Sequence, residues 1–595
     1  MGSKIADAGK RLSKTDIAAV CAFVLLAGAL LFTARYAWIS EDEYFYYAIA
    51  RRVANGDRLL GDEWSFIQLT SLFHLPFCSL FVAVTGGVDG IVLFMRGLFI
   101  AADLAVFWYC YLKLRGKGAC AVLAAFLFCA HPLAGVLALN YYNICLFAFV
   151  ILLLTALYPK KPLSRSKTLF CGAAFAAAVV CEPILAAVYP LFCVPALTAR
   201  IRRQKTDGPQ TAPLVPRRFL LWFTAGGGAV GAALLAFLCV TTGPGKILET
   251  LPLMFRTNPY HTPLGQLVRE KLSYLTEKYG VVNSVLLPLS AVAAAAVGTV
   301  CKQMKNGRYL RLCAFLVSSA TVVSCYVRVA RNTDVVNGLE AFFRAGAFPA
   351  FCFAPVGLRL CKKTDRRLSV FWMAALIFSL PMDLTSNFTL LACGTLAYFP
   401  AVCAAGVFLR ELREDFSAGR DNRRFGKTAF RAALAAACAV LLCECAALAA
   451  QLDLSLVKNR LSDAPVVVSD TGPGKGVCEP ADRVKRAAAI QRDLERIRAV
   501  SDGPFYAVHE SAYCYLTADL RVASYMPLYH DDDLNGRVLE YWNDRPENRP
   551  AYIYIVSLNV DERAVLRTVR QIGALCVGEP ERGEAGYLIE VKRWK

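Results

Sequence analysis

Three consecutive carboxylates, Glu41, Asp42 and Glu43, follow Ser40 at the point where the first long apolar segment ends. A carboxylate at a membrane surface costs free energy unless it is solvated, paired or used. One such group can take a proton from a hydroxyl within hydrogen-bonding reach, and a second acid can orient it. Ser40 and Glu43 also fit a capping box at a helix start, where acids are favoured in any case. Because capping uses only one of three carboxylates, we predict that Asp42 and Glu43 are catalytic and that one helix start serves both purposes.

A second acidic pair, Asp62 and Glu63, follows Gly61 after one short amphipathic stretch. If that stretch is a helix that folds back along the membrane surface, the two acidic pairs line one cavity. Such a cavity could hold a divalent cation, for which Glu43 and Asp62 are the candidate ligands. The alternative is that the second pair lies in a solvated loop.

Positive charge near these acids would suit a phosphate-bearing substrate, because arginine binds phosphate in a bidentate manner. The candidates lie in the first outer loop, in the span that follows it and in two later outer loops, and they are Arg96, His74, His261, Arg331 and Arg344. For Arg96 the alternative is a buried ion pair with Asp103, seven residues further along the same helical face. For the loop residues the alternative is that they only face lipid headgroups.

Two polar breaks in apolar segments could line the same cavity. They are the sequence Asn140-Tyr141-Tyr142-Asn143 and the pair Glu182-Pro183. Each is more often simply a helix terminus, and we rank both below the acidic pairs.

The elements that position these residues are mainly membrane-spanning. Of the 595 residues, 56% are hydrophobic, and the mean hydropathy is +0.44, which is too apolar for a soluble enzyme of this length. The net charge of +20 comes from short basic runs between apolar segments. That pattern is typical of cytoplasmic loops and argues against nucleic-acid binding. The 23 cysteines show no spacing typical of a zinc site.

Apolar stretches of roughly 20 residues can cross a bilayer. We predict about thirteen such spans, near 17–37, 91–112, 119–138, 143–158, 168–186, 187–199, 219–241, 283–300, 312–330, 346–361, 368–385, 388–409 and 428–450. The stretch 66–85 is predicted to lie along the outer surface, because a crossing there would put most later basic loops outside. The result is a multi-pass plasma-membrane protein with a cytoplasmic N-terminus and an extracytoplasmic C-terminus.

Residues 1–450 are therefore predicted as the transmembrane domain, with the acidic pairs in its first outer loop, 38–90. From about residue 451 the sequence becomes charged and mixed, which predicts a small extracytoplasmic α/β domain over 451–595. Its expected strands lie at 466–468, 505–508, 552–556 and 587–591, and its expected helices at 480–500 and 561–572.

With this topology, the sequence resembles the GT-C superfamily, and within it the bacterial ArnT and protein-O-mannosyltransferase branch. The likeness starts at Asp42-Glu43-x-x-Tyr46-Tyr47-Ala48-x-Ala50-Arg51 and continues through Gly56 and Pro76 to Arg96. It covers residues 38–115 well, the later spans only by topology, and the C-terminal domain barely.

The resemblance implies a membrane glycosyltransferase with a polyprenyl-phosphate-sugar donor, a lipid, glycan or protein acceptor on the outer membrane face, and inversion. By that likeness Asp42 is the base or the acid that orients the acceptor, Glu43 supports it or a metal, and no cofactor is certain, although a divalent metal is possible. One departure concerns the donor site. The ArnT branch has a Lys-Pro-Pro segment whose lysine meets the donor phosphate, whereas the corresponding stretch Ser65–Thr70 has no lysine. The cation would then come from His74, Arg96 or an outer loop.

Two other functions stay open. A lipid or sugar transporter predicts inverted repeats with broken helices in matched halves, and the sequence shows no such pairing. A non-catalytic envelope scaffold agrees with the missing lysine. One cavity that joins Asp42, Asp62 and an arginine would favour the enzyme, whereas dispersal of these groups would favour the scaffold.

Overall fold

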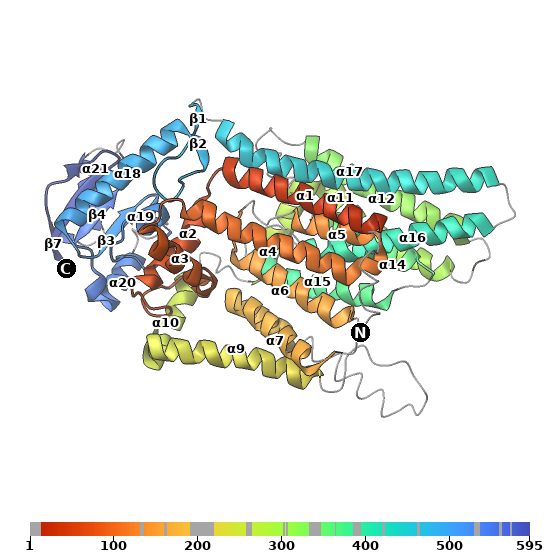
Figure 1. The fold of residues 1–595 in the computed structure, drawn as a ribbon, viewed down its shortest axis with the longest axis horizontal. Coiled ribbons are helices and arrows are strands. Elements are labelled where there is room, and N and C mark those ends of the chain that lie inside the picture. The colour runs from red at the N-terminus through yellow and green to blue at the C-terminus, as the bar shows by residue number, and fades with distance from the viewer. Residues whose placement is uncertain are drawn as a thin grey trace, which may run out of the picture.

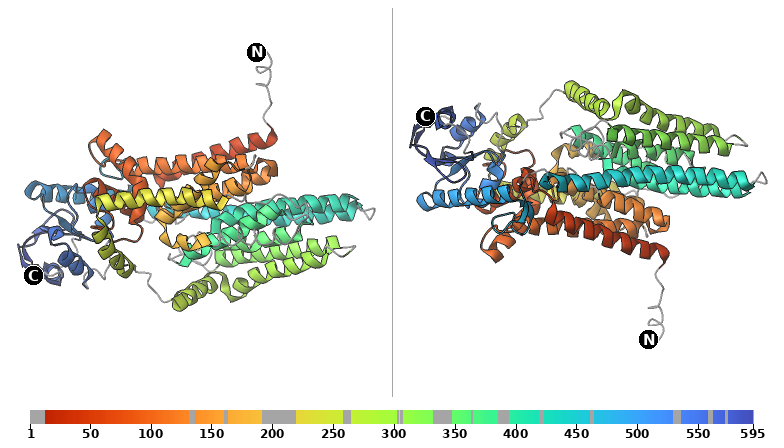
Figure 2. Two further views of the ribbon diagram at one scale, coloured as in Figure 1. Left: turned by 90° about the horizontal axis from the view of Figure 1, so that it is seen from below. Right: turned by 90° about the horizontal axis from the view of Figure 1, so that it is seen from above.

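The computed structural model describes residues 13–130, 136–159, 163–190, 219–257, 264–301, 304, 307–331, 347–362, 365–384, 394–418, 423–460, 464–528, 536–557, 562–571 and 574–594. In this part of the chain, a long helical bundle carries a smaller α/β domain at one end (Figure 1). The views in Figure 2 show the same arrangement from two further sides. We call the end of the bundle that carries the α/β domain the domain end.

The bundle consists of helices that are apolar along most of their length. They are α1 (Lys14–Tyr36), α4 (Ile91–Leu114), α5 (Ala119–Cys129), α6 (Tyr141–Leu157), α7 (Arg165–Cys181), α9 (Phe219–Thr241), α11 (Leu264–Cys301), α12 (Gly307–Arg331), α14 (Ala347–Leu360), α15 (Arg366–Leu384), α16 (Tyr398–Ala418) and α17 (Arg423–Arg460). The short helix α10 (Pro244–Thr257) lies at the domain end, and its buried apolar side chains belong to the core shared with the domain (Figure 1). Helix α17 runs along the bundle toward the α/β domain (Figure 1).

Nine helical segments within the described residues are long and apolar enough to cross a membrane. They confirm the predicted class, a polytopic helical membrane protein, while the number of about thirteen spans stays a prediction. One of the nine is Gln68–Thr85, the stretch predicted to lie along the surface, and it qualifies by length and composition alone. The predicted span 187–199 falls mainly outside the described residues.

Helices α7 and α9 cross with their backbones in contact. A Cβ atom on Gly172 would lie 1.9 Å from the carbonyl oxygen of Phe223, and one on Gly226 would lie 2.1 Å from that of Leu169. Small residues at such crossings let helices approach in a membrane, where packing drives association. These two glycines therefore fix how α9 sits against the bundle.

The C-terminal domain contains a five-stranded sheet with the path β3 (Phe505–Val508), β4 (Tyr552–Ile555), β7 (Tyr587–Trp594), β5 (Ala574–Val577), while β6 (Glu581–Arg582) also pairs with β7. Strands β3 and β4 are parallel and the other pairs are antiparallel. A separate antiparallel pair joins β1 (Val466–Val468) to β2 (Cys478–Pro480). The helices are α18 (Ala481–Val500), α19 (Ser511–Thr517), α20 (Arg537–Asp544) and α21 (Glu562–Gln571). The predicted strands and both predicted helices are confirmed.

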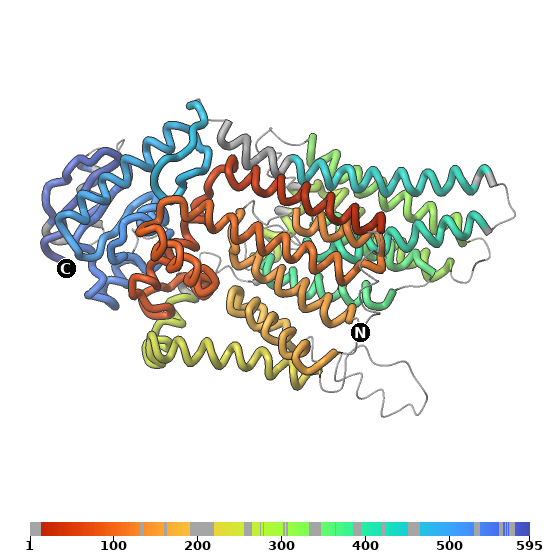
Figure 3. The backbone as a smooth tube through the Cα atoms, in the orientation of Figure 1, coloured from red at the N-terminus to blue at the C-terminus, as the bar shows by residue number. Residues whose placement is uncertain are grey.

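The segment that carries the acidic pairs lies between the bundle and the C-terminal domain (Figure 3). It contains α2 (Glu41–Ala54) and α3 (Ser71–Thr85). Its buried apolar side chains belong to the same hydrophobic core as those of the domain. The ring of Trp64, for example, lies 5.8 Å from Tyr525 and 5.1 Å from Tyr541, between ring centroids. The acidic segment is thus held from both sides.

Candidate active site

The first turn of α2 places the acidic cluster. The Ser40 hydroxyl accepts a hydrogen bond from the Glu43 backbone N–H at 3.3 Å, and the Glu43 carboxylate accepts one from the Ser40 N–H at 3.5 Å. This is the capping box expected from the sequence. Capping therefore accounts for Glu43, and it leaves Asp42 without a structural task.

Glu43 has a second partner from another helix. Arg96 of α4 donates to both of its carboxylate oxygens, at 2.7 and 2.8 Å, and the side chains of Arg96 and Glu43 are 0% and 1% exposed. A buried arginine–carboxylate pair with two hydrogen bonds is strong and specific in geometry. It fixes α2 against α4.

Arg96 has no donor left for a substrate. Besides Glu43, it donates to the backbone carbonyls of Ala34, Ala37 and Trp38, at 2.6 to 3.1 Å. These bonds use its remaining N–H groups and hold the end of α1. The alternative pair with Asp103 is also not formed. Arg96 is thus a structural clamp and no longer a candidate for the donor phosphate.

Asp42 contrasts with Glu43 in every respect. Its side chain is exposed, and it has neither a hydrogen bond nor an ion pair with any residue that the structure describes. The surrounding protein still removes part of its hydration, and this burial, together with the negative charge of Glu43, raises the pKa of Asp42. A carboxylate that is accessible, unpaired and of raised pKa is suited to accept a proton.

Aromatic residues and a histidine lie on the Asp42 side of α2. Burial, and then the charge of Asp42, raises the pKa of Tyr46, one helical turn further on. The Tyr46 ring stacks on His74 with centroids 5.8 Å apart and lies 6.4 Å from the ring of Tyr141. These groups form the wall beside Asp42.

Of the donor-phosphate candidates within the described residues, His74 is the one that lies at this wall. Its side chain is buried between Tyr46 and Tyr47. Within the described residues, neither ring nitrogen has a partner at hydrogen-bonding distance and angle, and only a looser interaction with the Thr70 backbone contributes. A buried polar group without such a partner points to a ligand or water at the site.

The second acidic pair points elsewhere. Asp62 accepts hydrogen bonds from the Arg58 backbone and side chain at 2.9 to 3.1 Å, and its carboxylate lies 3.8 Å from Arg545 of the C-terminal domain. Burial opposes ionisation, but the Arg58 hydrogen bonds outweigh it and lower the pKa of Asp62. Glu63 forms a buried ion pair with Arg52 at 2.6 Å.

The expectation that the two acidic pairs line one cavity is therefore wrong. Arg52, the partner of Glu63, stands ten residues after Asp42 on α2, or about 15 Å along the helix axis. Asp62 and Glu63 instead connect the loop to α2 and to the domain. The solvated-loop alternative is also wrong, since both side chains are buried. Of these four acids, Glu43, Asp62 and Glu63 are ion-paired, and Asp42 is the one without an ion pair among the described residues.

A divalent cation does not fit the ligands proposed for it. The carboxylates of Glu43 and Asp62 are occupied by Arg96 and Arg58. In the part of the chain that the structure describes, no group of three or more acidic, histidine or cysteine side chains is arranged to hold a metal.

The remaining phosphate candidates add little. Arg331 is exposed at the end of α12, whereas His261 and Arg344 lie outside the described residues.

Two features that ranked low in the sequence are near the site. Cys181 and Glu182, at the end of α7, contribute to the electrostatic environment of Tyr46. Asn140 caps α6 by accepting from the Asn143 N–H at 2.8 Å, as its helix-terminus alternative states, but this cap sets Tyr141 beside Tyr46. The sequence pointed to both features because each is a polar break in an apolar segment.

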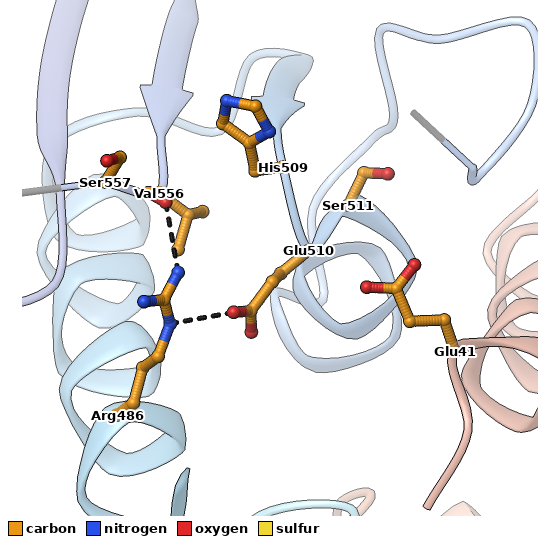
Figure 4. Close-up of a pocket in the computed structure, with 7 residues that line it drawn as sticks. All are labelled: Glu41, Arg486, His509, Glu510, Ser511, Val556 and Ser557. Atoms are coloured by element: carbon orange, nitrogen blue, oxygen red, sulfur yellow. Dashed lines mark hydrogen bonds and ion pairs between the residues drawn. The ribbon is translucent and has the colours of Figure 1, made fainter. Parts of the chain in front are cut away.

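Residues of the C-terminal domain also reach α2, which the sequence did not indicate. Glu41 lines a cavity with Arg486, His509, Glu510, Ser511, Val556 and Ser557 (Figure 4). Burial, and then the charges of Glu510 and Asp42, raises the pKa of Glu41.

Comparisons with known proteins are distant. No family model matches the sequence, and no curated protein matches it. Two similar solved structures are the archaeal oligosaccharyltransferase AglB from Archaeoglobus fulgidus, in complex with an inhibitory peptide and a dolichol-phosphate, and ArnT from Cupriavidus metallidurans, bound to undecaprenyl phosphate. Identity is 12% in both and the TM-score is 0.43 in both. The AglB match covers 90% of this chain and 69% of AglB, and the ArnT match covers 96% and 97%. Likeness at this distance carries no argument about activity, which has to come from the site.

Proposed function

We propose that this chain is an integral-membrane glycosyltransferase. It would move a sugar from a polyprenyl-phosphate carrier to a cell-envelope acceptor, with inversion at the sugar and with Asp42 as the base. The observation that carries the proposal is the contrast within one helical turn. Glu43 is buried and clamped by Arg96, while Asp42 is accessible, without a partner and of raised pKa.

The chemistry needs one base and one anionic leaving group. Asp42 takes the proton of an acceptor hydroxyl as its oxygen forms a bond to the anomeric carbon of the sugar. The bond from that carbon to the phosphate oxygen breaks, and the polyprenyl phosphate leaves with the electron pair. A lipid phosphate is a leaving group that needs no nucleotide, so the reaction can run outside the cytoplasm.

His74 is the group that we assign to the donor side. A neutral imidazole can donate one hydrogen bond to a phosphate oxygen. The His74 ring stacks on Tyr46, which lies on the Asp42 side of α2. Neither ring nitrogen of His74 has a well-formed hydrogen bond with a described residue. This assignment replaces Arg96.

The orientation that we propose puts the domain end outside the cytoplasm. Helix α4 starts beside the domain, where the Gly90 N–H donates to the Gly472 carbonyl at 3.0 Å, and it ends at the basic residues Arg115 and Lys117. Basic loops favour the cytoplasmic side. The N-terminus of α1 lies at the same far end of the bundle (Figure 1).

The test replaces Asp42 by Asn. Lipid-linked and surface glycans are profiled in cells that lack the gene and are complemented with wild type, Asp42→Asn or Asp502→Asn. Since a positioned base contributes about 10²–10⁴-fold to rate, we expect Asp42→Asn to restore none of the missing glycan at equal protein level. Transfer from labelled polyprenyl-phosphate sugar, measured in membranes, should slow by the same factor.

Asp502→Asn is the matched control, because Asp502 is exposed just before the amino-terminal end of β3. It should behave as wild type. If Asp42→Asn restores the glycan as well, Asp42 is not the base, and its catalytic assignment is wrong.

A further inference from the structure

The cavity beside Glu41 occupies a favoured position for ligand binding. Ligands in α/β sheets bind at the carboxyl ends of parallel strands. Residues His509 and Glu510 directly follow β3, and Val556 and Ser557 directly follow β4, the strand that lies parallel to it. The cavity has a volume of about 370 Å³. In Figure 4 it is bounded by the ends of these strands, by Arg486 of α18 and by Glu41 of α2.

The backbone at this edge is strained. His509 and Glu510 have φ values of 64° and 43°, so two successive residues that are not glycine adopt the left-handed conformation. Such strain persists only where the surroundings enforce it, and it gathers at ligand sites. Here it turns the chain from β3 directly into α19 and presents both side chains to the cavity.

The lining is polar and has little net charge. Arg486 forms an ion pair with Glu510 at 2.7 Å and donates to the Val556 carbonyl at 3.3 Å. With its guanidinium neutralised in this way and Glu41 opposite, the cavity does not favour a phosphate group. Of its seven lining residues, only Val556 has an apolar side chain, so the cavity also does not fit a lipid chain.

A molecule with several hydroxyl groups matches this lining. Hydroxyls both donate and accept, and the cavity offers carboxylate acceptors on Glu41 and Glu510. The Ser511 hydroxyl donates to the Pro527 carbonyl at 2.7 Å and keeps its lone pairs for a ligand donor. Ser557 is half-buried at the end of β4 and adds a further hydroxyl.

The cavity and Asp42 share the first turn of α2. Glu41 lines the cavity and precedes Asp42 in the chain, so their Cα atoms are about 3.8 Å apart. A ligand held by the domain would therefore lie beside the helix turn that carries Asp42.

We propose that this cavity binds the acceptor, and that the acceptor is a saccharide. The inference rests on the proposed function and deepens it, because it assigns the acceptor class and gives the C-terminal domain the task of holding it. The donor side is then formed by the bundle and the acceptor side by the domain, with Asp42 between them.

The test uses the full-length protein, labelled polyprenyl-phosphate sugar as donor, and membranes of the deletion strain as the source of unmodified acceptor. Ser557→Leu fills the cavity, and Glu510→Asn removes a carboxylate with a residue that tolerates positive φ. At limiting acceptor membranes we expect transfer at least about 10-fold slower than wild type, because about 1.4 kcal/mol of lost binding corresponds to that factor. The deficit should narrow as acceptor membranes increase, while half-saturation by the donor stays unchanged.

The controls separate the two proposals. Asp502→Asn, the matched acid-to-Asn change at the other end of β3, should transfer as wild type. Periodate treatment of the acceptor membranes, which cleaves vicinal diols, should abolish acceptance, and protease treatment should not. If Asp42→Asn is inactive while both cavity variants match wild type, or if acceptance is lost to protease and survives periodate, the acceptor inference fails and the enzyme stands. If the wild type transfers no sugar, both fail.

Discussion

At the scale of single residues, the catalytic argument depends on the ionisation of Asp42. A base works only when deprotonated, and burial, then the charge of Glu43, raises the pKa of Asp42 above its usual value of 3.8. The transfer rate should therefore fall on acidification at a pH above 3.8, with a slope of one in a log-rate plot. This acidic limb of the pH–rate profile is measured as the transfer rate in membranes, over the acidic pH range in which the protein stays folded.

The control for that profile is Asp502→Asn, which should keep the wild-type limb. The residual transfer rate of Asp42→Asn should no longer fall on acidification in this pH range. An acidic limb that is the same in Asp42→Asn and wild type would mean that another group controls the rate.

The sequence predicted the first turn of α2 and failed on the partners of its acids. The capping box is local, so three-residue spacing sufficed to predict it. The partner of Glu43 is 53 residues away, and Arg545 is 484 residues from the Gly61 carbonyl that it binds. Spacing along the chain carries no information about such contacts. The sequence therefore could not show that Asp62 is held in an ion pair, whereas Asp42 has none among the described residues.

At the scale of elements, hydropathy predicted most helices because lipid imposes one composition on every span. It could not predict which helices touch. Gly172 and Gly226 look like any other glycines in an apolar run, yet they set the α7–α9 crossing. The cavity beside Glu41 escaped prediction for a similar reason, because β3 and β4 are separated by α19 and α20 in the chain and meet only in the sheet.

The crossing gives an element-scale prediction. Gly172→Leu should separate α7 from α9 and cost about 1–3 kcal/mol, as expected for overpacking. The matched control is Gly228→Leu, since Gly228 is exposed on α9 and a Cβ there meets no atom within 4 Å. Thermal unfolding in detergent should show a lower midpoint for the first variant only. Equal midpoints would show that the close crossing does not stabilise the bundle.

At the scale of the whole molecule, the domain and the bundle meet through the acidic segment. Arg545 of the domain is 1% exposed, donates to the Gly61 carbonyl at 3.0 Å and lies 3.8 Å from Asp62. Arg52 of α2 donates to the Ser524 carbonyl at 2.8 Å and pairs with Glu63. This latch holds the domain's cavity against the helix that carries Asp42. Transfer should therefore depend on residues that touch neither substrate.

Breaking the latch should thus cost both stability and transfer. Arg545→Met removes the buried hydrogen bond from the guanidinium to the Gly61 carbonyl, and a hydrogen bond that involves a charged group contributes about 1.5–3 kcal/mol. Arg492→Met is the control, because the Arg492–Glu584 pair is exposed to solvent and contributes little to stability. The measurements are the unfolding midpoint and the half-saturation by acceptor membranes. The loop around Asp62 should also lose stability in acid. Burial raises the pKa of Asp62, but the hydrogen bonds from Arg58 outweigh it and lower that pKa, so the stability they contribute is present above the unfolded pKa and is lost as the pH falls through the folded pKa. A variant as stable as Arg492→Met, with unchanged half-saturation, would show that the domain docks without Arg545.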